Sequence, residues 1–250
     1  MITEKIVMQT EIIASEDGKH TYEIKRSWDD KGMKGLVLEL YPTLSIGRCG
    51  EMDLSTMHLL NHAKDFGWGS VRIINLYSLV CSGKPKTSEL FYDEENIAYI
   101  EEILESKDIS DYDIVIATGN SLAKHSKTIE AKIDILTMLL EKGLEPQIKY
   151  ITVDLEDKET MVGVHPLYLG LHHGKSVWRL EKFPIHDELK ILEETLKLKE
   201  KYTELKSKGI LNSENTVSVQ DSDTVSKEEK QDSVKKGGNK GNVPKNKKQA

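Results

Sequence analysis

The sequence predicts an α/β fold: a three-layer α/β/α sandwich around a mostly parallel central sheet, preceded by a β-hairpin. Short and nearly continuous apolar runs, such as Leu36 to Leu40, are typical of strands that are buried on both faces. These runs alternate with segments of helical periodicity. Such alternation favours parallel strands joined by right-handed crossovers through helices.

The N-terminal hairpin is predicted from two segments, 8–15 and 21–28, that flank a short polar loop. In the second segment, apolar and charged residues alternate as in a half-exposed strand. The loop between them contains Gly18, which tolerates the backbone dihedral angles of a tight turn.

The central elements follow in order, each ending at a recognisable signal. The first helix is predicted to begin near Asp53, with Asp53 or Ser55 as its N-cap, and to end at Gly67. Gly143 ends the long third helix in the same way. The predicted strands cover 35–42, 70–80, 111–120 and 148–155, and the predicted helices cover 53–66, 93–106 and 121–142.

Three regions are predicted along the chain. Residues 1–186 form a single α/β domain, and residues 187–210 form a charged helix with a narrow apolar stripe. From 211 to 250 the sequence is polar and without periodicity, and it ends in a lysine-rich stretch, so we expect a disordered tail.

Composition limits the cellular context and the partners. The net charge of -7 gives no overall basic signature for nucleic-acid binding. Cys49 and Cys81 are expected to be reduced thiols of a cytoplasmic protein. The first fifteen residues carry acids and no long apolar run, so we expect no signal peptide. No stretch approaches the roughly 18 apolar residues that span a membrane, so we expect no membrane partner.

Candidate functional residues lie where the predicted strands end, because open α/β sheets bind ligands outside the carboxyl ends of their strands. Asp53, Asn75 and His165 are the candidate catalytic residues. Each also has a purely structural interpretation: Asp53 as a helix cap, Asn75 in its own turn and His165 as a capping histidine bonded to backbone. The candidate ligand-binding residues are Tyr41, Pro42, Thr43, Tyr77, Thr118, Gly119, Asn120 and Tyr168.

Several classes of site are not predicted. The sequence contains no P-loop, no GxGxxG and no GxSxG, which disfavours kinases, P-loop NTPases and α/β serine hydrolases. His172 and His173 are adjacent in sequence, and adjacent side chains rarely bind one metal ion together. No Cys/His spacing is typical of zinc, so we expect neither a metal nor another cofactor.

At these same positions the sequence resembles the bacterial family known as domain of unknown function 1643. The resemblance covers about residues 20–184 and is most specific in its INLY and HPLYL pieces. The matching pieces are LYPT (Leu40 to Thr43), DLS (Asp53 to Ser55), FGWGSVRIINLY (Phe66 to Tyr77), ATGN (Ala117 to Asn120) and HPLYL (His165 to Leu169).

The layout is also distantly similar to the uracil-DNA glycosylase superfamily. That resemblance implies base or nucleotide recognition, with His165 donating to a departing base, Asp53 orienting water and Asn75 reading a base edge. If the protein recognises a base in this way, Tyr77 or Tyr168 would stack on that base.

This sequence departs from the two families at several positions. Tyr41 stands where the family has asparagine before proline, and Met57 and His58 stand where it has arginines. Thr118 and Gly119 replace an aromatic-glycine turn, and the HPLYL piece lacks the glycosylase serine. These departures argue against a working DNA glycosylase and leave open whether the chain is an enzyme.

Two functions are therefore predicted as alternatives. In the first, a pocket at the carboxyl edge of the sheet recognises a nucleobase, a nucleotide or nucleic acid, with N-glycosidic bond hydrolysis as the reaction if the protein is an enzyme. In the second, the chain is a non-catalytic module that binds a ligand or a protein partner through its C-terminal helix and tail.

Overall fold

The computed structural model describes residues 1–89, 91, 93–153 and 162–207. The chain divides into two units, Met1–Glu204 and Leu205–Ala250, and the sheet with its helices belongs to the first. The predicted tail from 211 to 250 lies outside the described residues. Among the described residues, no helix is both long enough and apolar enough to cross a membrane.

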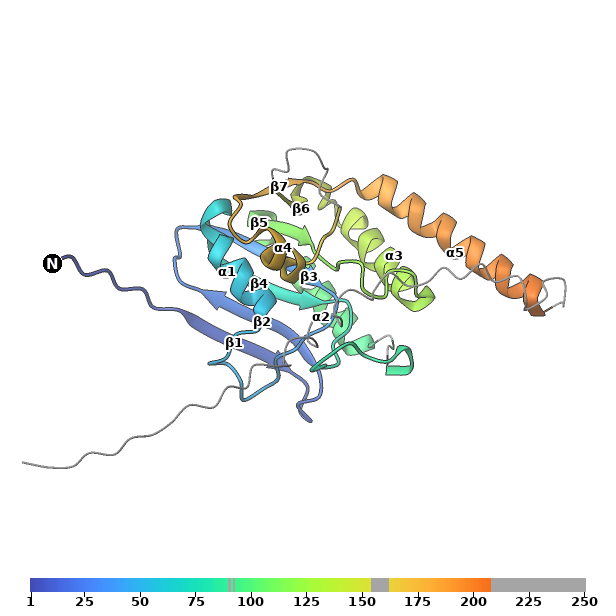
Figure 1. The fold of residues 1–250 in the computed structure, drawn as a ribbon, viewed down its shortest axis with the longest axis horizontal. Helices are drawn as coiled ribbons and strands as arrows, with labels where there is room; N and C mark the ends of the chain where they lie inside the picture. Colours follow the sequence, from blue (N-terminus) through green and yellow to red (C-terminus); the bar gives the residue numbers. More distant parts are fainter. Residues whose placement is uncertain (90, 92, 154–161, 208–250) are drawn as a thin grey trace, which may run out of the picture. The chain divides into compact units, whose positions relative to one another are not determined.

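The first unit is an α/β fold built on a mixed seven-stranded sheet, which confirms the predicted class (Figure 1). The order across the sheet is β1-β2-β4-β3-β5-β6-β7. The strands are β1 (Gln9–Ala14), β2 (Thr21–Ser27), β3 (Met33–Glu39), β4 (Trp68–Asn75), β5 (Tyr112–Ile116), β6 (Ile148–Val153) and β7 (Trp178–Lys182). The helices of the described residues are α1 (Leu54–Phe66), α2 (Glu94–Leu104), α3 (Ser126–Glu141), α4 (Pro166–His173) and α5 (Ile185–Ser207).

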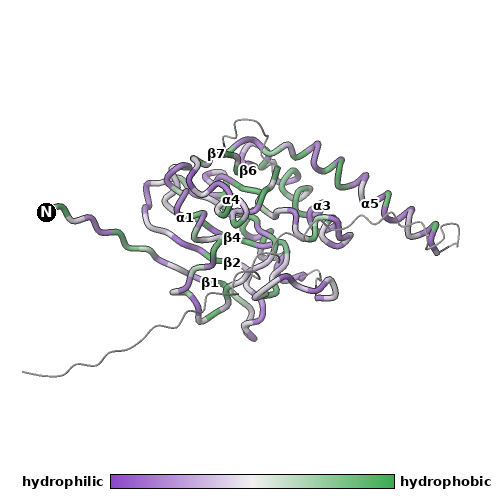
Figure 2. The backbone as a smooth tube through the Cα atoms, viewed as in Figure 1, coloured by the Kyte–Doolittle hydropathy of each residue, from purple (hydrophilic) through white to green (hydrophobic). Residues whose placement is uncertain are grey.

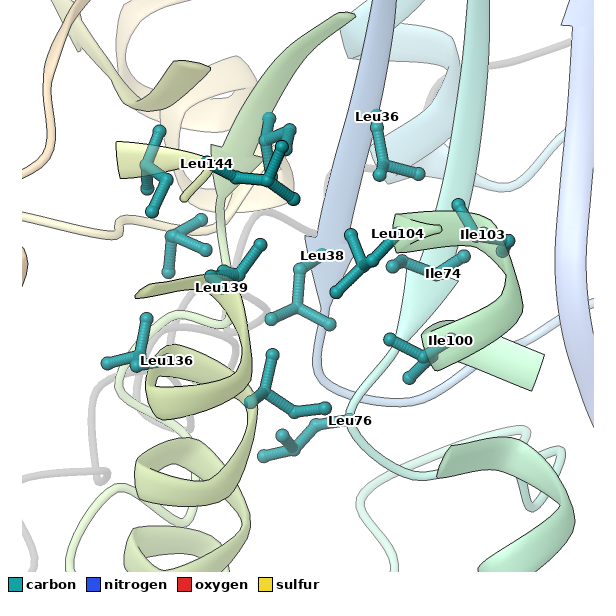
Figure 3. Close-up of a cluster of buried hydrophobic side chains, with 14 of the residues drawn as sticks. Leu36, Leu38, Ile74, Leu76, Ile100, Ile103, Leu104, Leu136, Leu139 and Leu144 are labelled. Atoms are coloured by element: carbon teal, nitrogen blue, oxygen red, sulfur yellow. The ribbon is translucent and has the colours of Figure 1, made fainter. Parts of the chain in front are cut away.

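The apolar run of β3 is buried on both faces, as its composition predicts. Leu36 and Leu38 pack with α2 and α3, and Figure 3 shows both leucines among the side chains of these two helices. Val37 packs on the other face, with Leu59 of α1 and Leu169 of α4. Successive residues of β3 therefore point to opposite faces of the sheet.

The sheet is mixed rather than mostly parallel, which corrects the prediction. The pairs β4–β3, β3–β5 and β5–β6 are parallel, whereas β1–β2, β2–β4 and β6–β7 are antiparallel. The predicted hairpin is present, but β2 continues the sheet beside β4. The edge strand β7 was not predicted, because its five residues include three charged ones and give a weak apolar pattern.

The segment around His165 also differs from the expected loop. The loop ends at His165, and α4 begins at Pro166, the first helical position. Proline suits that position because its fixed φ matches a helix and its missing N–H would have no partner there. His165 is the N-cap and its side chain accepts the N–H of Leu167, which confirms the structural interpretation of a capping histidine bonded to backbone.

The long C-terminal helix begins at Ile185 rather than Asp187. Its exposed apolar residues include Ile191, Leu198 and Tyr202, and green and purple alternate along it in Figure 2. The division into a domain, a helix and a tail, and the docking of a partner on this helix, stay predictions.

Candidate functional site at the carboxyl edge of the sheet

The site is organised by a buried acid, Glu39, at the last position of β3. Glu39 lies opposite Asn75 of β4 in the parallel register, and it is only 5% exposed. Alternation along the strand puts its side chain on the face of Val37, where α1 and α4 pack. Glu39 was not among the site residues predicted from the sequence. The feature that could have indicated it is a single charge within the otherwise apolar run GLVLEL.

The Glu39 carboxyl group is poorly supplied with hydrogen-bond donors. Its Oε2 lies 3.3 Å from the Ser55 hydroxyl oxygen and 3.6 Å from His165 Nε2. Its Oε1 is buried and has no hydrogen-bond partner within the part of the chain that the structure describes. Burial, reinforced by the nearby charge of Asp53, raises the pKa of Glu39 to about 8. Glu39 is therefore largely protonated at neutral pH.

Asp53 is a second carboxylate, and its environment has the opposite effect. It caps α1, with Oδ1 accepting the Thr56 N–H at 2.8 Å and lying 3.0 Å from the Ser55 hydroxyl. Its Oδ2 accepts from the Thr43 hydroxyl at 2.7 Å. Burial alone would raise the pKa of Asp53, but these hydrogen bonds outweigh burial and hold it below its usual value. The two acids of the site thus differ in charge at neutral pH.

His165 approaches the same acids from α4. Its Nδ1 accepts the N–H of Leu167 at 3.2 Å, so the proton of the neutral ring belongs on Nε2, the atom that faces Glu39. Burial lowers the pKa of His165 to about 4, although the charge of Asp53 opposes the shift. The side chain keeps 26% of its surface exposed. It is a neutral donor at the border between the site and solvent.

Gly119 allows the His165 loop to approach the end of β5. Its φ is +66°, and a Cβ on this residue would lie 2.8 Å from the Cβ of His165. The N–H of Gly119 also donates to the carbonyl of Gly163 at 2.8 Å. Only glycine permits both the dihedral angle and this contact.

Asn75 brings an unpaired amide to the site. It is 1% exposed, and neither Oδ1 nor Nδ2 has a hydrogen-bond partner among the described residues. Its backbone carbonyl is occupied, because Asn96 Nδ2 donates to it at 3.0 Å. Alternation places the Asn75 side chain on the face of Ile73, which is also the face of Glu39. A buried amide without partners is rare in folded proteins and is expected to meet water or a ligand.

The structure places the other predicted residues in three different environments. Thr43 and Gly119 belong to the site through Asp53 and His165. Tyr77 is buried toward the opposite face, with its hydroxyl 3.0 Å from that of Thr128, and Tyr41 packs against the same apolar cluster. These two aromatic rings are not brought to the acids.

The remaining predicted residues follow β3 and β5 or lie on α4. Pro42 is buried, and its carbonyl accepts the N–H of Cys81 at 2.9 Å. Thr118 is buried, whereas Asn120 is exposed. Tyr168 is 53% exposed, and its ring lies 4.3 Å from that of His172 on the outer side of α4.

An open depression of about 460 Å³ lies at the other end of the sheet. It is lined by residues from the amino ends of β3, β5 and β6, including Lys34, Asp111 and Lys149. Lys34 donates to Asp108 at 2.9 Å. Within the described residues, no group of three or more His, Cys, Asp or Glu side chains is arranged to hold a metal ion.

Comparison with known families tests the resemblance seen in the sequence. A family profile described as protein of unknown function (DUF1643) matches residues 21–167. This span is more than half of the 250 residues. The chain belongs to this family. The predicted membership of DUF1643 is therefore confirmed.

The DUF1643 region contains the whole candidate site. It begins at the first residue of β2 and ends inside α4, so it includes Glu39, Asp53, Asn75, Gly119 and His165. It leaves out β1, β7 and α5. No curated protein and no solved structure matches the chain.

Proposed function

We propose that this DUF1643 protein recognises a nucleobase, as a free base, in a nucleotide or in nucleic acid, at the carboxyl edge of its sheet. The observation that carries the proposal is the buried amide of Asn75, whose donor and acceptor are both free. An amide that offers one donor and one acceptor matches the edge of a base, which presents the same pair of groups. The free Oε1 of Glu39 on the neighbouring strand adds a third polar atom.

The position of these groups also supports the proposal. They lie at the carboxyl ends of parallel strands, where ligands bind in α/β sheets. Helices α1 and α4 pack on one face of the sheet, and α2 and α3 pack on the other. We include in this proposal that the fold is a three-layer sandwich like that of uracil-DNA glycosylases. Tyr41, which stands where that superfamily has asparagine, makes recognition a better-supported function than cleavage.

Two charge states would suit hydrolysis of an N-glycosidic bond, if the bound ligand is cleaved. Asp53 is ionised at neutral pH and could orient a water molecule toward the sugar carbon. His165 carries a proton on Nε2 and would stabilise the negative charge that the departing base gains. Water would supply the hydroxyl group to the sugar and a proton to the base.

The test is a thermal-shift screen of the full chain with free bases, nucleosides, 5′-nucleotides and short single-stranded DNA. A ligand of the folded state raises stability by RT ln(1 + [L]/Kd), or about 2.7 kcal/mol at a hundred times Kd. We expect at least one base-containing compound to give a concentration-dependent shift. Chromatography of the incubated ligand then separates binding from turnover.

Matched variants connect the shift to the site. Asn75→Leu keeps the side-chain volume and removes the amide, so it should abolish the ligand-dependent shift. Tyr77→Phe removes a hydroxyl that lies on the opposite face, beside Thr128, and should leave the shift unchanged. A screen without any base-dependent shift, or an equal shift in Asn75→Leu, would refute the proposal.

A further inference from the structure

The two acids of the site share one hydroxyl hydrogen. Ser55 Oγ lies 3.0 Å from Asp53 Oδ1 and 3.3 Å from Glu39 Oε2. A serine hydroxyl donates once but also accepts. Its hydrogen goes to the ionised Asp53, because hydrogen bonds to a charged acceptor are the stronger ones. Ser55 Oγ is then an acceptor toward Glu39.

This assignment fixes which Glu39 oxygen carries the proton. A proton on Oε2 completes a chain in which Glu39 donates to Ser55 and Ser55 donates to Asp53. The raised pKa of Glu39 agrees with a protonated carboxyl group. Oε1 is then the carbonyl oxygen of the acid, an acceptor for which the described residues supply no donor. Ionisation of Glu39 would leave Oε1 an acceptor as well.

We propose that Glu39 makes the site selective for bases that carry an exocyclic amino group, because its buried Oε1 accepts from that group beside the Asn75 amide. This inference rests on the proposed base recognition. Cytosine, adenine and guanine present an amino group as a donor. Uracil and thymine present a carbonyl oxygen at the position of the cytosine amino group, and that oxygen would face Oε1 as a second acceptor.

Cytidine and uridine form the sharpest pair of probes, because they share the sugar and differ at one edge of the base. We expect titration calorimetry on the full chain to give a Kd for cytidine at least about tenfold lower than for uridine. The tenfold ratio corresponds to about 1.4 kcal/mol, within the range for leaving a buried acceptor without a donor.

Variants at two glutamates assign the preference to Glu39. Glu39→Gln has nearly the same shape, and its amide can rotate to donate to a carbonyl, so the ratio should fall to within about threefold. Glu51→Gln makes the same substitution at an exposed side chain paired with Arg48, and it should keep the wild-type ratio. If Glu39→Gln does not fold, the ratio of the uridine and cytidine Kd values of the wild-type protein alone tests the preference for an amino group.

The outcomes separate this inference from the function on which it rests. Equal affinity for the two nucleosides, or a preference for uridine, overturns the amino-group selectivity and leaves base recognition standing. An unchanged ratio in Glu39→Gln overturns the role of Glu39. If no base or nucleoside binds the wild-type protein, both proposals fail.

Discussion

The two edges of the central sheet differ in how their polar groups are satisfied. At the carboxyl edge, Glu39 and Asn75 are buried and retain polar atoms without partners. At the amino edge, Lys34 and Asp108 are paired at 2.9 Å, with 35% and 47% of their side chains exposed. The amino edge has an open depression of about 460 Å³, in whose described lining Lys34 is paired and Gln147 keeps one buried oxygen without a partner. The hollow and the pair of adjacent residues with unpartnered buried atoms thus lie at opposite edges of the sheet.

The energetic reason is the cost of desolvation. A buried donor or acceptor without a partner costs about 1–3 kcal/mol, which is a large share of the stability of a domain. An exposed ion pair contributes about 0–1 kcal/mol. Among the described residues, the three unpartnered atoms of Glu39 and Asn75 therefore cost more on folding than the single unpartnered oxygen of Gln147 in the amino-edge depression.

The largest effect is expected for Glu39→Gln and its dependence on pH. The pKa of Glu39 rises from 4.5 to about 8 on folding, so the folded state binds the proton more tightly than the unfolded state. The stability from this proton is complete below about pH 4.5 and is lost as pH rises to about 8. Glutamine does not titrate. The variant should therefore gain on the order of 3 kcal/mol relative to wild type between pH 5 and pH 8.

Urea unfolding at the two pH values measures this change, provided that the m-values agree. The control is Asp108→Asn at the amino edge. The pKa of Asp108 is lowered, chiefly by its hydrogen bond to Lys34. Its contribution to the free energy of unfolding therefore changes only at pH values below the usual pKa range of an aspartate. Its effect should be flat between pH 5 and pH 8. If the stability of wild type and of Glu39→Gln changed equally with pH, the buried carboxyl group of the carboxyl edge would not differ in this respect from the exposed one of the amino edge.

A smaller effect is expected where Gly119 contacts His165. Gly119→Ala combines a left-handed backbone angle with a Cβ placed 2.8 Å from that of His165. Gly143→Ala is matched in φ, at +70°, but its Cβ would meet nothing within 4 Å. We expect a loss of about 1 kcal/mol for Gly143→Ala from backbone strain alone. Gly119→Ala should lose about 2 kcal/mol, because the His165 loop must also move.

Denaturant midpoints of the two alanine variants measure the difference, and ligand binding gives an independent readout. Gly119→Ala should weaken any base-dependent thermal shift, whereas Gly143→Ala should preserve it. Equal losses of stability would mean that the His165 loop adapts without cost and is not held in place by the end of β5.

The sequence predicted the scaffold of the site better than its centre. Apolar runs such as that of β3 have a period and a length, and Asp53 has a recognised capping role, so both could be located from local pattern. Glu39 could not be singled out in that way, because a charge at a strand end is more often exposed than buried. Its burial follows from how α1 and α4 pack on the sheet, which is a tertiary property.

Side-chain direction limited the other predictions. Tyr77 follows the same strand as Asn75, and position along the chain suggested that both would serve one site. The structure turns Tyr77 into the apolar cluster of α2 and α3, while the alternation of β4 puts Asn75 on the face of Glu39. The antiparallel pairing of β2 with β4 and of β7 with β6 depends equally on long-range contacts, which apolar periodicity does not specify.

The smallest effect is expected at the amino edge itself. Lys34→Met removes the charge that pairs with Asp108 while keeping most of the apolar stem, and both partners are partly exposed. Screening by water should hold the loss of stability within about 0.5 kcal/mol, and added salt should reduce it further. Urea unfolding in low and high salt measures the effect. A loss comparable to that of Gly119→Ala would show that this depression also holds a strained or desolvated group, and the contrast between the two edges would no longer stand.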